Sequence, residues 1–166
     1  WSNLIVNGEF QAKYIVNTIP WAEVAESSQL PFGINRDVQS LKYSGIDVDY
    51  YCKNEETDAH WIYIPDSNIS YHRKLIRGNF INSAKGYWTE TNSKRRVDSR
   101  ESGPRFKNKY AYPINTINKK KQVKNIMDWF QEKNIYGLGR WGTWEHMNSD
   151  IATVKAIELA KLFINK

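Results

Sequence analysis

A polar segment near the C-terminal end of the sequence carries the strongest chemical signal. The residues from Gly139 to Asp150 read Gly-Arg-Trp-Gly-Thr-Trp-Glu-His-Met-Asn-Ser-Asp and stand between a predicted strand and a predicted helix. The planar fork of Arg140 can bind a phosphate group through two parallel hydrogen bonds. The backbone N–H groups at the start of the helix point outward and carry partial positive charge. They therefore suit an anion or an electron-rich ring edge.

Two arginines on a predicted strand form a second candidate site. Arg73 and Arg77 fall on the same face of that strand, where like charges repel unless an anion or carboxylates lie beside them. Two interpretations stay open. Arg73 contacts a ligand phosphate, or it forms a buried ion pair with Glu90.

Metal and nucleophile chemistry find little support in the sequence. His60 and His72 have no partner at metal-ligand spacing. The single cysteine, Cys52, excludes an intrachain disulfide framework and a cysteine-based zinc site. No Ser-His-Asp or Cys-His arrangement stands out. We therefore expect no metal site, and we expect Cys52 to lie in the core.

Length and composition indicate one folded domain. The chain has 166 residues, of which 40% are hydrophobic and 25% are charged. The mean hydropathy is −0.69, and no apolar run approaches the roughly 18–20 residues of a membrane span. The first residues lack the features of a signal peptide, and we expect Trp1 to be an internal position of a longer polypeptide. A single cysteine fits a reducing, cytoplasmic setting.

The positive charge is concentrated in one part of the chain. Residues 94–133 hold 12 basic and 4 acidic residues, whereas the whole chain has a net charge of +6. Such a basic sector suits nucleic acid, anionic lipid or a phosphorylated metabolite, or it is a solvated surface. The 7 Trp and 10 Tyr residues fit a core and also a ligand surface.

Hydrophobic periodicity and turn residues predict an α+β fold. We expect a single unit over 1–166, with an antiparallel sheet region (13–92), a basic loop with a Tyr-Pro-Ile segment (93–118), and a helix, a strand and a C-terminal helix (119–166). The expected strands cover 13–20, 41–52, 60–64, 70–80, 86–92, 110–116 and 135–139, the expected helices cover 22–30, 119–133 and 151–164, and 93–108 is expected to be a loop.

Four motifs together resemble a known family. The 139–150 segment is similar to the C-terminal motif of UDP-galactopyranose mutases and their relatives in the flavin amine-oxidase superfamily, Gly-Arg-x-Gly/Ala-Thr-Tyr-x-Tyr-Leu/Met-Asp/Asn-x-Asp followed by a helix. Tyr112-Pro113-Ile114 resembles the family's Tyr-Pro-Ile/Val element. The Ser-Tyr-His-Arg sequence that ends at Arg73 resembles its Tyr-x-Arg strand, and Thr18-Ile19-Pro20 resembles its Thr-x-Pro return to the flavin domain. The motifs occur in the family's order over nearly the whole chain.

The resemblance implies FAD as cofactor and a nucleotide sugar as substrate. The family's N-terminal Gly-x-Gly-x-x-Gly motif does not occur here, so the chain resembles a C-terminal portion whose partner is the FAD-binding half of the same polypeptide. The helix and strand elements from 119 onward would belong to the split FAD-binding domain. The implied cofactor-binding residues are Gly139, Arg140, Met147, Asn148 and Asp150. The implied substrate-binding residues are Arg73, Tyr112, Arg140, Trp144 and His146, of which Trp144 and His146 stand where the family has tyrosines.

The activity implied by the resemblance is the interconversion of UDP-galactopyranose and UDP-galactofuranose for cell-surface polysaccharide and lipopolysaccharide synthesis. The reduced flavin, through its N5 atom, would carry the chemistry, so no protein residue is expected to be catalytic, and this portion alone is expected to be inactive. Two alternatives stay open. One is a flavin-dependent amine oxidase or protoporphyrinogen-oxidase-like enzyme, and the other is a non-enzymatic basic and aromatic binding module. Homo-oligomerisation stays open, and membrane or nucleic-acid partners are not expected.

Overall fold

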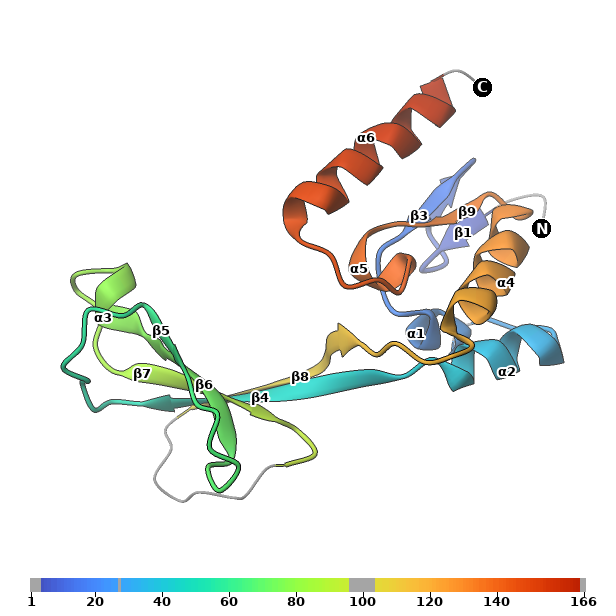
Figure 1. Cartoon of the computed structure of the whole chain (residues 1–166). Coiled ribbons are helices and arrows are strands. Elements are labelled where there is room, and N and C mark those ends of the chain that lie inside the picture. The colour runs from blue at the N-terminus through green and yellow to red at the C-terminus, as the bar shows by residue number, and fades with distance from the viewer. Residues whose placement is uncertain (1–3, 27, 96–103, 165–166) are drawn as a thin grey trace. The chain divides into compact units, whose positions relative to one another are not determined.

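The computed structural model describes residues 4–26, 28–95 and 104–164 (Figure 1). The chain divides into two compact units. The first, here called the split unit, contains the described residues up to Lys42 and from Pro113 onward. The second, the sheet unit, runs from Tyr43 to Tyr112. Helices make up 34% of the described residues and strands make up 30%, which confirms the α+β class.

The sheet unit is built on a five-stranded sheet with strand order β5-β6-β7-β4-β8. The pairs β5–β6, β6–β7 and β7–β4 are antiparallel. A short helix, α3, follows β6 directly. The bounds are β4 Tyr43–Tyr51, β5 Trp61–Tyr63, β6 Tyr71–Ile76, α3 Arg77–Phe80, β7 Tyr87–Asn92 and β8 Arg105–Pro113.

Acidic and hydroxyl side chains are buried on one face of this sheet. Asp47 and Asp49 on β4 are only 4% and 7% exposed, and they lie opposite Thr91 and Thr89 on β7. Hydrogen bonds satisfy both carboxylates, because the Ser93 hydroxyl donates to Asp47 and the guanidinium of Arg105 donates to Asp49.

The expectation that Cys52 lies in the core was wrong: β4 ends at Tyr51, and Cys52 is exposed.

The split unit combines a parallel strand pair with helices. β3 (Ile15–Asn17) pairs in parallel with β9 (Ile135–Gly137), and β1 (Leu4–Val6) forms a hairpin with β2 (Phe10–Ala12). The core lies among three helices, where the rings of Trp21 and Phe130 stack with their centroids 4.6 Å apart. These helices are α1 Trp21–Glu26, α2 Phe32–Ser40 and α4 Lys119–Gln131, and α5 Gly139–Gly142 and α6 Ser149–Ile164 complete the unit.

Several elements differ from the sequence-based expectation. The strand expected over 13–20 pairs in parallel with β9 instead of joining an antiparallel meander. α2 was not predicted, β6 ends at Ile76 where a strand to 80 was expected, and β8 begins at Arg105 inside the expected loop. Residues 96–103 of that loop lie outside the described part of the chain. Helix α4 confirms the predicted pattern, with Val123, Ile126 and Phe130 buried.

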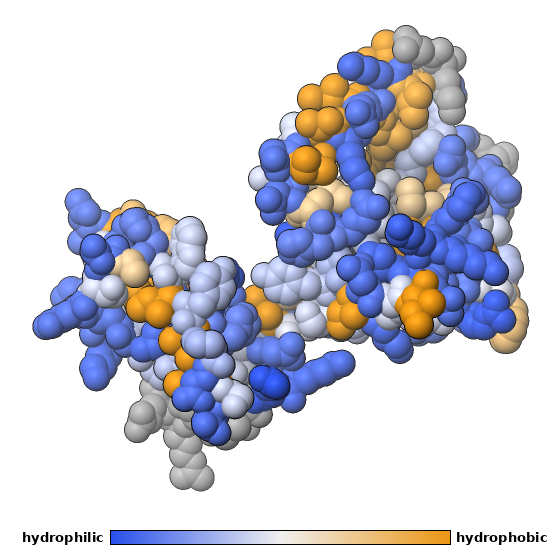
Figure 2. All heavy atoms as spheres, in the orientation of Figure 1, coloured by the Kyte–Doolittle hydropathy of each residue, from blue (hydrophilic) through white to orange (hydrophobic). Residues whose placement is uncertain are grey.

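Helix α6 carries apolar residues on two sides. Phe163 packs onto the body of the unit, with its ring stacked 4.8 Å from that of Tyr14. Ile151, Val154 and Ile157 are about half exposed, and Figure 2 shows orange side chains along this helix. Among the described residues, no helix is both long and apolar enough to cross a membrane.

Candidate functional site

Two glycines bring three stretches of backbone together at the end of β9. A Cβ atom added to Gly137 would lie 2.2 Å from the carbonyl oxygen of Gly142. A Cβ added to Gly142 would lie 2.3 Å from the carbonyl oxygen of Asn17 on β3. The indole of Trp21 donates a hydrogen bond to the Gly142 carbonyl at 3.0 Å. This contact between β3, β9 and α5 fixes where the chain leaves the strand pair, and we call the segment 137–150 the glycine junction.

Gly139 and Arg140 shape the next part of the glycine junction. Gly139 has φ +70°, a left-handed conformation that favours glycine, and no atom would lie within 4 Å of an added Cβ. The half-buried Arg140 donates from Nη2 to the carbonyl oxygen of Met147 at 3.0 Å. This bond joins the start of α5 to the segment just before α6. The arginine therefore helps to hold the backbone that carries the first N–H groups of α6.

Trp144 is a buried anchor of the same segment. It is 1% exposed, adopts φ +52° and donates its indole N–H to the carbonyl oxygen of Lys42 at 3.2 Å. Its own carbonyl accepts a hydrogen bond from the Lys119 amine at 3.0 Å, and that amine also reaches Asn115. The structure gives Trp144 a packing role, and its predicted contact with a substrate stays a prediction.

An open hollow of about 510 Å³ lies at the start of α6. His146, Met147 and Asn148 line it, together with Asn115, Lys119, Glu145 and Ile151. His146 and Asn148 are exposed, whereas Met147 is 8% exposed. The first N–H groups of a helix have no partner within the helix, so the 16-residue α6 brings hydrogen-bond donors to this hollow. Lys119 adds a positive charge, and the salt bridge to Lys155 compensates Glu145.

In the sheet unit, Arg73 pairs with Glu90. Its Nε donates to the Glu90 carboxylate at 2.9 Å, and Glu90 is only 8% exposed. Burial lowers the pKa of Arg73, but hydrogen bonds to Glu90 and Tyr63 and the charge of Glu90 outweigh it and raise the pKa. The structure therefore contains the ion pair that was one of the two interpretations of Arg73.

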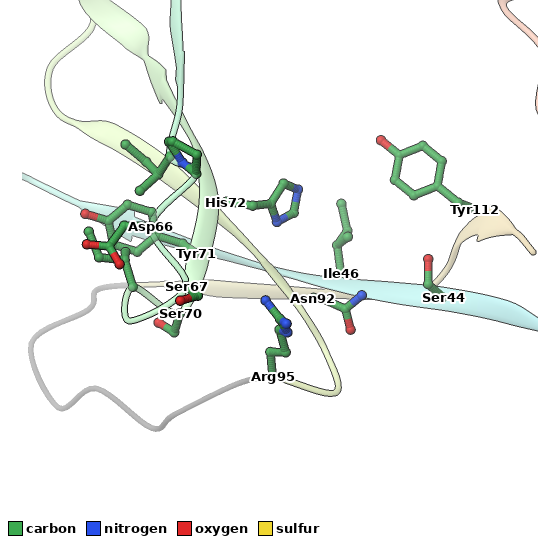
Figure 3. Close-up of a pocket in the computed structure, with 13 residues that line it drawn as sticks. Ser44, Ile46, Asp66, Ser67, Ser70, Tyr71, His72, Asn92, Arg95 and Tyr112 are labelled. Carbon is green, nitrogen blue, oxygen red and sulfur yellow. The ribbon is translucent and has the colours of Figure 1, made fainter.

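Tyr112 lines a second hollow, of about 380 Å³, in the sheet unit (Figure 3). It also interacts electrostatically with Arg73.

The structure thus collects the predicted residues in two places. Gly139, Arg140, Trp144, His146, Met147, Asn148 and Asp150 belong to the glycine junction, and Arg73 and Tyr112 belong to the sheet unit. Asp150 is exposed in the first turn of α6.

Sequence reasoning missed several residues of these sites. Gly137 was not singled out, although it stands two residues before Gly139 in the sequence. Its close contact with the Gly142 carbonyl becomes visible only in the structure. Lys119 was placed on a helix but not at a site, because its contacts with Asn115 and Trp144 depend on tertiary folding. Among the described residues, no group of three or more His, Cys, Asp or Glu side chains could hold a metal ion.

Comparison with known proteins shows a similarity of fold. No family model matches the sequence, and a search of curated proteins finds no match. The chain is similar to the crystal structure of reduced UDP-galactopyranose mutase, with a TM-score of 0.61 and 17% identity, over 79% of this chain and 36% of that chain. A protein from Exiguobacterium sp. 255-15, assigned as a protoporphyrinogen oxidase, aligns with a TM-score of 0.48 and 9% identity, over 79% of this chain and 37% of that chain.

These findings define the fold as that of part of UDP-galactopyranose mutase. The chain spans about a third of the solved mutase chain, 36% of its length. The fold expected from the sequence motifs is therefore confirmed. At 17% identity, activity, cofactor and substrate do not follow from the fold.

Proposed function

We propose that this chain is the flavin-edge and substrate-binding part of a flavin-dependent enzyme that interconverts UDP-galactopyranose and UDP-galactofuranose. The observation that carries the proposal is the similarity of fold to reduced UDP-galactopyranose mutase over 79% of the chain. The Gly-Arg-x-Gly-Thr motif supports it, because it forms an ordered turn that leads into the start of α6. The proposal places the protein in the cytoplasm and in cell-surface polysaccharide synthesis.

The residues of the glycine junction fit the edge of a flavin ring. The segment from Met147 to Asp150 brings N–H groups to an open hollow, and such donors stabilise negative charge on an electron-rich ring. Gly139 leaves free space beside its backbone, which allows a ligand to approach closely. Arg140 holds the Met147 carbonyl and so keeps these donors in place. When bound, reduced FAD would supply the nucleophile toward the anomeric carbon of the sugar.

The protein side chains would bind and orient the substrate. His146 and Lys119 line the hollow at the glycine junction and can donate hydrogen bonds to phosphate oxygens. In the sheet unit, the hydroxyl of Tyr112 can donate a hydrogen bond to a ligand oxygen. The carboxylate of Glu90 holds the guanidinium of Arg73 in a fixed position on the sheet. Arg73 would therefore contribute its positive charge from an ordered side chain.

The proposal includes an FAD-binding half as a partner of this chain. A parallel sheet is normally covered on both faces and has more than two strands, yet in the described part of the chain β3 and β9 form a parallel pair of only two strands. Helix α6 also has an apolar side that is half exposed. Both features would be satisfied by an α/β partner that supplies further strands and binds the FAD pyrophosphate.

The test is the absorption spectrum of the polypeptide expressed from the start codon of its gene. Absorption bands of bound flavin, at about 350–500 nm, would support the flavoenzyme class. Arg140→Ala is expected to lower the FAD content at least about tenfold, because it releases the backbone donors near the ring. Arg36→Ala is the matched control, because Arg36 is an exposed arginine on α2 outside both hollows.

Product analysis then separates the candidate reactions. Dithionite-dependent conversion of UDP-galactofuranose to UDP-galactopyranose would support the mutase. Reduction of the flavin by an amine or a porphyrinogen, without turnover of the UDP-sugar, would replace the mutase by an oxidase. A colourless, folded protein that added FAD cannot restore would overturn the proposal and leave the binding module.

A further inference from the structure

The sheet unit buries a polar face and leaves an apolar face open. Asp49 on β4 and Thr89 on β7 lie opposite each other on the polar face, and both are buried. Among the described residues of this unit, the only buried hydrophobic side chains are those of Ile76 and Ala111. A sheet normally packs its hydrophobic face against another layer. In the described part of the chain, the apolar face therefore lacks the layer that would cover it.

Aromatic and aliphatic side chains of neighbouring strands form the open face. Leu75 on β6 lies directly opposite Trp61 on β5 and Trp88 on β7, so the three side chains share one face. Phe106 on β8 continues this face, with its ring centroid 5.6 Å from that of Trp88. Trp61 and Phe106 are exposed. A continuous exposed apolar surface of this kind marks a site of interaction.

Two adjacent hollows lie on the apolar face. One, of about 290 Å³, is lined by Phe80 and Ile81, and the other, of about 320 Å³, is lined by Phe106. Leu75 and Trp88 line both hollows, and we call the two together the apolar groove. A membrane surface takes up protruding apolar side chains, whereas a groove receives the side chains of a partner. The geometry therefore favours a polypeptide over a lipid bilayer.

Positive charge borders the apolar groove. Arg77, the first residue of α3, lines the 290 Å³ hollow. Its guanidinium carbon lies 5.8 Å from the centre of the Trp88 ring, and its Nη1 donates to the carbonyl oxygen of Lys85 at 3.2 Å. Arg77 forms no salt bridge within the described residues, whereas Glu90, which lines the other hollow, is already paired with Arg73. The groove is thus complementary to a partner that carries a carboxylate.

We propose that the apolar groove docks an amphipathic helix of a partner polypeptide, with apolar side chains in the two hollows and a carboxylate on Arg77. In α+β folds, helices cover one face of an antiparallel sheet. Among its described residues, the sheet unit itself has only the four-residue helix α3 (Figure 1). Helix side chains at positions i and i+3 or i+4 lie on one side and can enter adjacent hollows. The inference requires neither FAD nor a UDP-sugar, so it and the proposed function fail separately.

The experiment is a selection of phage-displayed peptides on the 166-residue chain. The library consists of helical peptides of about 20 residues with varied surface positions. Peptides that also bind the Ile81→Ser variant are removed, which restricts the selection to the groove. Ile81 is exposed, so this variant is expected to fold. The selected peptides are expected to carry apolar side chains at i and i+3 or i+4 and an excess of Asp and Glu.

Binding of a selected peptide is then measured by ¹⁵N NMR and calorimetry. The peptide is expected to shift the indole resonance of Trp88. Phe106→Ser, which changes the hollow not used in the selection, should weaken binding at least about tenfold, and Arg77→Gln at least about fivefold. Ile117→Ser and Lys107→Gln are the matched controls, because both residues are exposed and lie outside the groove. Each control should change the affinity less than about twofold.

Each outcome decides the proposal. Losses in both Phe106→Ser and Arg77→Gln, with unchanged controls, support it. An absence of enriched peptides, or enrichment without acidic residues, would overturn it. Equal losses in Arg77→Gln and Lys107→Gln would show general charge attraction and would also overturn it. If no peptide binds and Phe106→Ser abolishes binding to phosphatidylglycerol vesicles, the groove belongs to a membrane-binding surface and the helix is excluded.

Discussion

The glycine junction and the sheet unit position their functional groups by different physical means. At the glycine junction, backbone meets backbone so closely that Gly137 and Gly142 leave no room for a Cβ atom. In the sheet unit, the groups are held by side-chain pairs across strands, such as Arg73 with Glu90 and Arg105 with Asp49. The glycine junction thus depends on the lack of side chains at Gly137 and Gly142. The sheet unit depends on charged side chains that pair between neighbouring strands.

This difference affects how each region tolerates change. A backbone contact has no flexible atoms that can move aside, so a single added carbon must shift a strand or a helix. A side-chain pair can relax, because partly solvated partners exchange their hydrogen bonds for water. We therefore expect the largest effects of substitution at the glycine junction, and the predictions below run from there to the smallest effect.

The first prediction concerns Gly142. Gly142→Ala would place a Cβ atom 2.3 Å from the Asn17 carbonyl oxygen, so we expect a loss of about 3 kcal/mol in the free energy of unfolding. Gly33→Ala in α2 is the control, because nothing lies within 4 Å of its added Cβ. That control should be stabilising by up to about 1 kcal/mol, from helix propensity. Urea unfolding followed by tryptophan fluorescence measures both, and equal stabilities would refute the steric argument.

The second prediction concerns the Arg73–Glu90 pair. Glu90→Gln keeps the shape of the side chain but leaves the Arg73 guanidinium without its counter-charge. A fully buried pair would cost about 3–5 kcal/mol, but the Arg73 side chain is 24% exposed, so we expect about 1–2 kcal/mol. Asp128→Asn is the comparison, since it breaks the exposed pair with Lys124 and should cost less than about 0.5 kcal/mol. Equal losses of stability in Glu90→Gln and Asp128→Asn would mean that burial does not strengthen the Arg73–Glu90 pair.

Local sequence patterns predicted the elements that depend on local periodicity. Helix α4 shows its apolar stripe in the sequence, and Val123, Ile126 and Phe130 are buried as expected. The α2 helix was missed because its pattern is interrupted by polar residues: the buried Asp37 is compensated by a hydrogen bond from Asn125 on α4. That partner lies far along the chain and gives no local signal.

The sites could be predicted only in part for the same reason. The motif from 139 to 150 is contiguous, so its residues were found together. The burial of Asp47 and Asp49 could not be read from alternation, because it depends on Ser93 and Arg105 reaching the same sheet face. Arg95 and His72 line the same hollow because β6 pairs with β7, and the sequence alone does not define this pairing.

The third prediction separates the two demands that a glycine can meet. Gly139 has φ +70° but free space around it, whereas Gly142 lacks space. Gly139→Ala should therefore cost about 1 kcal/mol, and Gly139→Asn less, because asparagine tolerates the left-handed conformation. At Gly142, asparagine should be worse than alanine because it is larger. Thermal unfolding of the four variants measures these orders, and the same order at both positions would contradict the distinction.

The last prediction concerns alkaline pH in the sheet unit. The Lys74 amine lies 2.6 Å from the Glu55 carboxylate and 4.6 Å from the centre of the Tyr87 ring. Burial lowers the pKa of Lys74, but the hydrogen bond to Glu55 and nearby charges outweigh it and raise the pKa above 10.5. Burial also raises the pKa of Tyr87 above 10.0, against the opposing charge of Lys74. The folded protein therefore holds both protons more tightly than the unfolded chain does.

For both groups, this contribution to stability is complete below about pH 10 and is lost as the pH rises through the raised pKa values. We expect the free energy of unfolding to fall more steeply above pH 10 in the unmodified chain than in Lys74→Met, by less than about 1 kcal/mol. Lys121→Met removes an exposed lysine of α4 and should leave the slope unchanged. Identical slopes in the unmodified chain and Lys74→Met would mean that the Lys74–Glu55 contact does not couple stability to pH. The sheet unit would then depend on its other cross-strand pairs, such as Arg73–Glu90, whose charges do not change in this range.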